Sequence, residues 1–187
     1  TFFGFAPQNK IINQSKVALN NDIWITGNIG DSYIGFQILS NKINIRNSKI
    51  KKYFINKYYF PKACKIDSEI FKYVKSITDI SDGFIGDLKK MLDYKYGAKL
   101  NLDKIPFSNF LKKLISDNKI SNKLILNSGD NYELIIISDK KYRSKIINIS
   151  KKSKLKITRV GVVTKKIQIL DDSNNILNMP REYDHFL

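Results

Sequence analysis

The sequence predicts an α/β or α+β domain, built as a mixed sheet with helices on its faces. Strand and helix patterns alternate along most of the chain, but the last two strand patterns, 157–163 and 167–170, are separated only by a short turn. Alternation is typical of parallel βαβ units and adjacent strands are typical of antiparallel pairs, so one sheet is expected to contain both. The chain has 187 residues, 42% of them hydrophobic, which is enough for one good core.

The first half of the chain predicts two strands and four helices. The strand patterns are short apolar runs that end at turn residues, and the helix patterns repeat apolar residues every three or four positions. The expected strands are 23–26 and 77–80, and the expected helices are 32–39, 50–60, 68–74 and 84–92. Pro61 separates the second helix from the third, and Gly83 precedes the fourth.

The second half of the chain predicts four strands and three helices. Residues 132–137 are rich in apolar and β-branched side chains, which suits a central strand. The remaining expected strands are 98–102, 157–163 and 167–170, and the expected helices follow Pro106, surround Leu124 and span 140–149. The two last strands are expected to pair with each other across the turn at 164–166.

An acidic cluster stands out in the segment ITDISDGFIGDL, residues 77–88, of a chain whose net charge is +16. Strand periodicity directs Asp79 and Ser81 to the same side, and the chain then turns at Asp82 into a helix. Free N–H groups and the helix dipole at such a junction suit a phosphate oxygen. Magnesium binds one or two carboxylates together with waters and phosphates, which Asp79 and Asp82 could supply.

A simpler interpretation of the same segment is helix capping. Ser81 and Asp82 are both of residue types that are favoured at the N-cap of a helix. A cap accounts for one residue of the cluster and not for all three of its aspartates. Both interpretations therefore stay open at this point.

Composition excludes several other classes of protein. One cysteine, Cys64, rules out an internal disulfide framework, and the chain has no Cys/His cluster suited to zinc. No apolar run has the length of a membrane span, and the first residues lack the features of a signal peptide, so a cytoplasmic location is expected. A nucleic-acid partner is disfavoured, because only four of the 33 basic residues are arginines and the lysines are scattered.

Five ordered segments carry a resemblance to a known family. They are DIWITGNIGDSYIGF at 22–36, ITDISDGFIGDL at 77–88, GAKLNL at 97–102 with IPF at 105–107, SGDNYEL at 128–134 and REYDHFL at 181–187. In this order they resemble the C-terminal half of bacterial thiamine-monophosphate kinases. That family shares a superfamily with aminoimidazole ribonucleotide synthetase, selenophosphate synthetase and a hydrogenase maturation factor.

The resemblance implies a fold like the C-terminal domain of the aminoimidazole ribonucleotide synthetase superfamily, and an activity. The activity is ATP- and Mg²⁺-dependent phosphorylation of thiamine phosphate to thiamine diphosphate. It also implies roles by position: Asp79 and Asp82 would bind magnesium, Ser81 would contact ATP, and Asp130 and Tyr183 would contact thiamine phosphate. No covalent nucleophile is implied, since phosphoryl transfer relies on positioning and charge neutralisation.

The resemblance also implies that part of the active site is missing. The chain begins at Thr1, and residues 1–21 are expected to connect an absent N-terminal domain to one C-terminal domain spanning 1–187. Departures from the family pattern occur at Ser15, Asp130, Asn131 and Glu182. The chain alone is therefore expected to be an inactive kinase domain that a separately encoded N-terminal half could complete. A non-catalytic remnant and a basic nucleic-acid-binding module are the alternatives.

Overall fold

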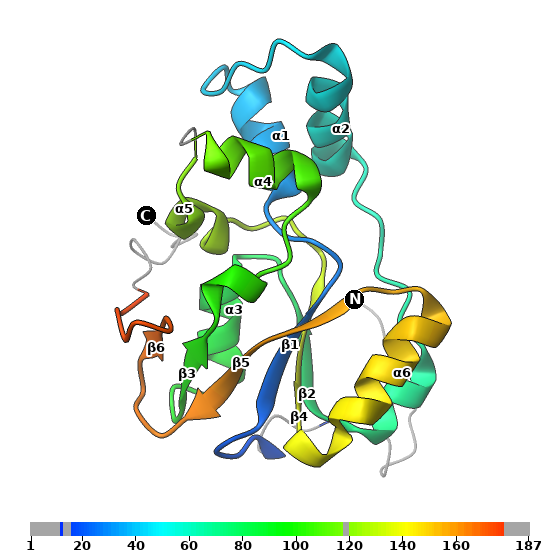
Figure 1. Cartoon of the computed structure of the whole chain (residues 1–187), viewed down its shortest axis with the longest axis vertical. Helices are drawn as coiled ribbons and strands as arrows, with labels where there is room; N and C mark the ends of the chain where they lie inside the picture. Colours follow the sequence, from blue (N-terminus) through cyan, green and yellow to red (C-terminus); the bar gives the residue numbers. More distant parts are fainter. Residues whose placement is uncertain (1–11, 13–15, 118–119, 178–187) are drawn as a thin grey trace, which may run out of the picture.

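A six-stranded mixed sheet forms the centre of the molecule (Figure 1). The computed structural model describes residues 12, 16–117 and 120–177. The strands are β1 (Asp22–Thr26), β2 (Val74–Asp79), β3 (Gly97–Leu100), β4 (Leu134–Ser138), β5 (Ile157–Thr164) and β6 (Ile169–Leu170). Their order is β2-β4-β1-β5-β3-β6, and neighbours are antiparallel except for the parallel pair β3 and β6. The predicted mixed sheet is confirmed.

Helices and short 3₁₀ turns connect the strands. The helices are α1 (Asp31–Leu39), α2 (Ser48–Tyr59), α3 (Phe84–Met91), α4 (Asn109–Ser116), α5 (Asn122–Leu126) and α6 (Arg143–Ser153), and the 3₁₀ turns are η3 (Ser68–Lys72), η4 (Leu102–Lys104) and η5 (Lys140–Tyr142). Side chains cap several of them: Asn47 accepts from the Ile50 N–H at the start of α2, and Ser108 accepts from the Leu111 N–H at the start of α4. Helices α1, α2 and α4 gather at one end of the sheet (Figure 1).

The two faces of the sheet bury separate apolar clusters. Ile23 and Ile25 of β1 point into the larger core, which helices α1 to α5 complete. Trp24, between them, points to the opposite face, where it packs in a cluster with Ile146 of α6 and Ile70 of η3. Strand periodicity of two thus supplies a core on each side of the sheet.

One predicted strand pair is wrong. Strand β6 does not pair with β5, because Gly97–Leu100 of β3 occupy that edge of β5 in register with Gly161–Thr164. The chain passes over the start of β3, and β6 pairs in parallel with its far side, Ala98 opposite Ile169. The short turn at 164–166 had predicted a hairpin, but a third strand is inserted between its two arms.

Several predicted boundaries also shift. The expected helix at 68–74 is only the 3₁₀ turn η3, after which β2 begins at Val74. The expected strand at 132–137 begins only at Leu134, because Asp130 and Tyr132 adopt positive φ values of 56° and 52° that a strand does not accommodate. Tyr183, Ser15, Glu182 and most of the expected connection at 1–21 lie outside the described residues.

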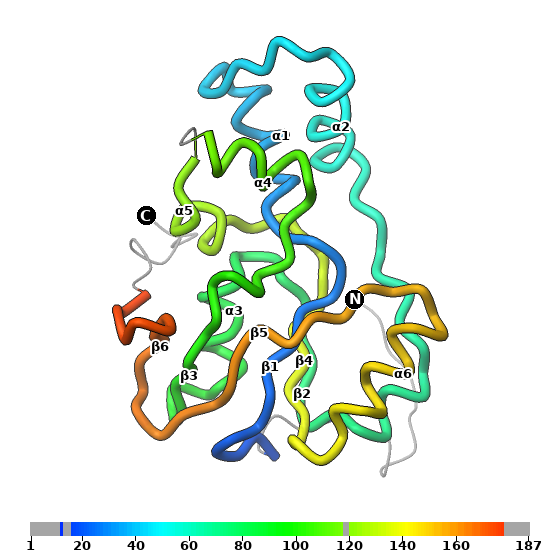
Figure 2. The backbone as a smooth tube through the Cα atoms, viewed as in Figure 1, coloured from blue at the N-terminus to red at the C-terminus, as the bar shows by residue number. Residues whose placement is uncertain are grey.

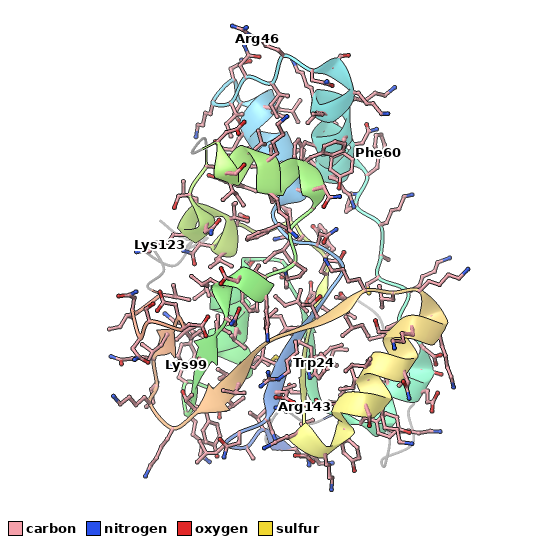
Figure 3. All side chains as sticks on the ribbon, in the orientation of Figure 1. Trp24, Arg46, Phe60, Lys99, Lys123 and Arg143 are labelled. Carbon is pink, nitrogen blue, oxygen red and sulfur yellow. The ribbon has the colours of Figure 1, made fainter. Side chains whose placement is uncertain are left out.

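Two further properties bear on possible partners. Among the described residues, none of the helices combines the length and the apolar composition of a membrane span. Figure 3 shows nitrogen-tipped side chains around much of the outline, and the labelled Arg46, Lys99 and Lys123 belong to different parts of the fold. In this view the basic residues are spread over the molecule, as their scatter along the sequence predicted.

Candidate functional site

Two connections lie against each other at one end of β2 and β4 (Figure 2). One is 80–83, between β2 and α3, and the other is 127–133, between α5 and β4. The Ile80 N–H donates to the Glu133 carbonyl at 2.8 Å, and the Asp130 N–H donates to the Ser81 carbonyl at 2.8 Å. A Cβ on Gly129 would lie 2.2 Å from the Ser81 oxygen, so this approach requires glycine. The backbone therefore holds the two connections in a fixed relation.

A cavity of about 420 Å³ opens where these connections meet helices α1 and α2. Three of the predicted site residues, Ser81, Asp82 and Asp130, line this cavity. The other lining residues are Ser32, Tyr33, Phe36, Tyr58, Asn127, Ser128 and Gly129. The volume is within the range of small-molecule sites, about 300–1,000 Å³. We call this space the junction cavity.

Asp79 lies beside the junction cavity and not in it. It is exposed at the end of β2 and lines a second cavity of about 360 Å³ together with Tyr132. The Tyr132 hydroxyl donates to Asp130 Oδ1 at 3.4 Å, and the negative charges of Asp130, foremost, and of Asp79 help to raise the pKa of Tyr132. Strand periodicity had placed Asp79 and Ser81 on the same side, but in the structure they line different cavities.

Asp87, in the first turn of α3, organises the aspartate segment. Its Oδ2 accepts hydrogen bonds from the N–H groups of Ser81 at 3.0 Å and of Asp82 and Gly83 at 3.1 Å each. Helix α3 begins after Gly83 without a side-chain cap, so capping by Ser81 or Asp82 is wrong. The N–H groups at 81–83 were expected to be free for phosphate, but Asp87 uses them. Burial is the main cause that raises the pKa of Asp87, and these hydrogen bonds oppose it.

The carboxylates of Asp79 and Asp82 are the predicted ligands of a metal ion. The described residues contain no group of three His, Cys, Asp or Glu side chains that could hold an ion. Asp82 is half-exposed, and its Oδ2 forms an ion pair with Lys90 Nζ at 2.6 Å. Asp79 and Asp82 fit the magnesium sites that combine one or two carboxylates with waters and substrate phosphates, but a metal on Asp82 must compete with Lys90.

The start of α1 is hydrogen-bonded to the 127–133 connection. Asn131 Oδ1 accepts from the Gly30 N–H at 2.6 Å, while Asn131 Nδ2 donates to the Ser128 carbonyl at 2.8 Å. A carboxylate at position 131 could accept the first bond but could not donate the second. Asp31, next along the chain, is buried and accepts from Ser108 Oγ and the Tyr53 hydroxyl at 2.6 Å each. Burial raises the pKa of Asp31 despite these two bonds.

A family model matches most of this fold. The model for "AIR synthase related protein, C-terminal domain" matches residues 54–170, which include β2 to β6, the acidic segment and the 127–133 connection. The chain belongs to this family.

Two relatives and one solved structure show which proteins of this family are similar to the chain. The thiamine-monophosphate kinase of Buchnera aphidicola subsp. Schizaphis graminum is 35% identical over 91% of this chain and 54% of its own length. The kinase of the same name from Buchnera aphidicola subsp. Acyrthosiphon pisum is 30% identical over 100% of this chain and 59% of its own length. The solved structure "AaThiL complexed with AMPPCP and TMP" superposes with a TM-score of 0.72 at 22% identity, covering 94% of this chain and 54% of that one.

These matches confirm the predicted resemblance to the C-terminal half of thiamine-monophosphate kinases. The chain spans about half the length of the curated relatives it matches: 59% and 54% of the two kinases. The family model and the structural match together confirm the predicted fold, that of an AIR synthase-like C-terminal domain.

Sequence reasoning missed several residues in and around the junction cavity. Asp87 was counted in the acidic cluster, and its place in the first helical turn was the available signal for a role at the N-terminus. Nothing in the sequence pointed to Lys90 except its helical spacing, three residues after Asp87. The aromatic side chains of α1 and α2 in the junction cavity could not be found, because only tertiary packing brings these two helices to the aspartate segment.

Proposed function

We propose that the chain is the C-terminal domain of a thiamine-monophosphate kinase, which transfers a phosphoryl group from ATP to thiamine phosphate. In this proposal Asp79 and Asp82 hold magnesium, Ser81 contacts ATP, and Asp130 contacts thiamine phosphate. Tyr183, outside the described residues, keeps its proposed contact with thiamine phosphate. A cytoplasmic location stays a prediction.

One observation carries the proposal. Ser81 and Asp82 come from one connection and Asp130 from another, yet all three line one cavity of about 420 Å³ in a chain whose matched relatives are thiamine-monophosphate kinases. Support for the two ligands comes from a structural neighbour described as a complex with AMPPCP, an ATP analogue, and TMP.

Phosphoryl transfer requires mainly that the protein positions the two substrates and neutralises their phosphate charge. Bound magnesium would screen the phosphate charges at the two aspartates. Asp87 keeps the Ser81 and Asp82 backbone in place, because one carboxylate oxygen accepts their N–H groups together with that of Gly83. Asn131 holds the 127–133 connection against the start of α1, which sets the position of Asp130.

The proposal includes an N-terminal half that completes the site. The described residues contain no group of three carboxylate, His or Cys side chains that could hold a metal, whereas the resemblance implies a site with several magnesium ions. The chain covers 54% of the Buchnera aphidicola subsp. Schizaphis graminum kinase, which leaves room in that relative for a second domain. We infer that phosphoryl transfer needs this half, whether it is attached or separately encoded.

Magnesium-dependent nucleotide binding tests the proposal. Isothermal titration of the chain with AMPPCP is expected to show weak binding that strengthens when magnesium is added. The double variant Asp79→Asn with Asp82→Asn is expected to lose the magnesium-dependent part, since amides replace both carboxylates.

The matched control removes two negative charges at positions outside the junction cavity. Asp103→Asn with Asp172→Asn removes two exposed carboxylates away from the junction cavity, so it is expected to bind AMPPCP as the unchanged chain does. If the Asp79 and Asp82 variant kept full magnesium dependence, or if both double variants lost it equally, the site assignment would be wrong.

A non-catalytic remnant of the kinase is the second candidate. The ion pair between Lys90 and Asp82 favours it, because an ammonium group occupies an oxygen that a metal would need. The remnant would bind nucleotide weakly and form no thiamine diphosphate when an N-terminal half is supplied. Formation of thiamine diphosphate by the completed protein would exclude it.

A further inference from the structure

Lys90 of α3 forms the ion pairs of the aspartate segment. Its Nζ lies 2.6 Å from Asp82 Oδ2 and 4.0 Å from Asp87 Oδ1. The other oxygen of Asp87 accepts the N–H groups of Ser81, Asp82 and Gly83. Among the described residues, no other lysine or arginine forms an ion pair with either carboxylate. One ammonium group thus lies between a predicted metal ligand and the side chain that holds the backbone of that ligand.

The ion pair between Lys90 and Asp82 is easily separated. The two side chains are 55% and 50% exposed, and exposed ion pairs are weak because water solvates both charges. Lysine carries its charge on a flexible four-carbon side chain, so the ammonium group can move while α3 stays in place. Asp87 Oδ1 keeps a second negative charge near it. Lys90 can therefore leave Asp82 without losing every negative neighbour.

The lining of the junction cavity gives no positive charge to a phosphate group. Among the described residues that line it, only Asp82 and Asp130 are charged, and both are acidic. Carboxylates repel the negative charges of a nucleotide triphosphate. Binding of its phosphates therefore requires cations, and Lys90 is a protein cation that lies directly beside this lining.

We propose that Lys90 is a movable counter-ion: it pairs with Asp82 until a magnesium ion binds there, and then pairs with a phosphate group of the nucleotide. This inference rests on the proposed function for the metal at Asp82 and for the nucleotide. Oxygen ligands of one magnesium ion lie within about 4 Å of one another, since each is about 2.1 Å from the metal. A small movement of the Lys90 side chain away from Asp82 Oδ2 therefore brings its ammonium group to such a phosphate oxygen.

The proposal predicts opposite effects on metal and nucleotide affinity. Lys90→Gln removes the ammonium group that competes for Asp82, so Mn²⁺ alone is expected to bind about threefold more tightly or better. The same variant removes a positive charge from the phosphates, so AMPPCP at saturating Mn²⁺ is expected to bind about threefold more weakly or worse. A residue that only stabilised α3 would change both affinities in the same direction.

The experiment measures Mn²⁺ binding by water proton relaxation and AMPPCP binding by isothermal titration at saturating Mn²⁺. Lys89→Gln is the matched control, because it removes the same charge from the neighbouring position of α3, and Lys89 forms no ion pair among the described residues. It is expected to leave both affinities unchanged. Lys90→Arg keeps the positive charge and is expected to behave more like the unchanged chain than like Lys90→Gln.

Several results would overturn the inference. They are equal Mn²⁺ affinity of the unchanged chain and Lys90→Gln, undiminished AMPPCP binding by that variant, or the same two effects in Lys89→Gln, which would trace them to net charge alone. The proposed function fails in a different way. If Asp79→Asn with Asp82→Asn bound Mn²⁺ and AMPPCP as tightly as the unchanged chain, the site assignment would be wrong whatever the Lys90 variants did.

Discussion

Asp22 shows how this chain uses its few arginines. The side chain is fully buried in β1, where Oδ1 accepts from Arg159 Nε at 2.6 Å and from Arg143 Nη2 at 2.7 Å. Arg143 belongs to α6 and Asp22 to β1, so their hydrogen bonds join this helix to the sheet. Two of the chain's four arginines are thereby committed to the fold, which agrees with the weak sequence signal for nucleic-acid binding.

Replacing Asp22 by Asn is expected to destabilise the fold by about 3 kcal/mol at neutral pH, because two arginines lose a buried charged partner. Burial raises the pKa of Asp22, but hydrogen bonds and charges of the two arginines outweigh it and hold this pKa below 3.8. The Asp22 contribution is therefore complete above pH 3.8 and declines as the pH falls through the lowered pKa.

Urea unfolding of both proteins as a function of pH checks this prediction. The difference in unfolding free energy between the unchanged chain and Asp22→Asn is expected to shrink below pH 3.8. A difference that stayed constant into strong acid would mean that the carboxylate charge contributes nothing.

At the scale of elements, the junction between β2 and α3 depends on one side chain. Asp87 accepts three backbone N–H groups from the turn that carries Ser81 and Asp82. Asp87→Ala leaves those groups without a partner and is expected to cost about 2–3 kcal/mol, while Asp87→Asn keeps an acceptor oxygen and is expected to cost less.

Amide hydrogen exchange measures the effect where it occurs. Faster exchange is expected at residues 81–83 in Asp87→Ala, together with weaker AMPPCP binding, and intermediate behaviour is expected in Asp87→Asn. Unchanged exchange at these three amides in the alanine variant would show that Asp87 does not hold the turn.

Sequence patterns predicted the elements better than their connections. The spacing of Phe84, Leu88 and Met91 was enough to place α3, because those side chains face the core. The Asp87 hydrogen bonds could not be predicted, since a bend in the turn brings the N–H groups to a residue further along the chain. The late start of β4 has a similar cause, because positive φ at Asp130 and Tyr132 is not visible in their residue types.

At the scale of the molecule, the mixed sheet was predicted but its strand order was not. Adjacent strand patterns predicted that β5 and β6 would pair, whereas β3 lies between them through contacts distant in sequence. The same holds for the candidate site: the motifs predicted Ser81, Asp82 and Asp130, but the junction cavity forms only where two connections and two helices meet. Contacts between residues distant in sequence determine the strand order and the cavity, which local sequence patterns do not specify.

The proposed function places a metal and nucleotide site where the 80–83 and 127–133 connections meet. Paramagnetic broadening of amide NMR signals by Mn²⁺, added with AMPPCP in place of magnesium, tests it directly. We expect the strongest broadening at residues 79–82 and 128–133, and its loss in the double variant Asp79→Asn with Asp82→Asn. Broadening centred elsewhere, or unchanged by that double substitution, would contradict it.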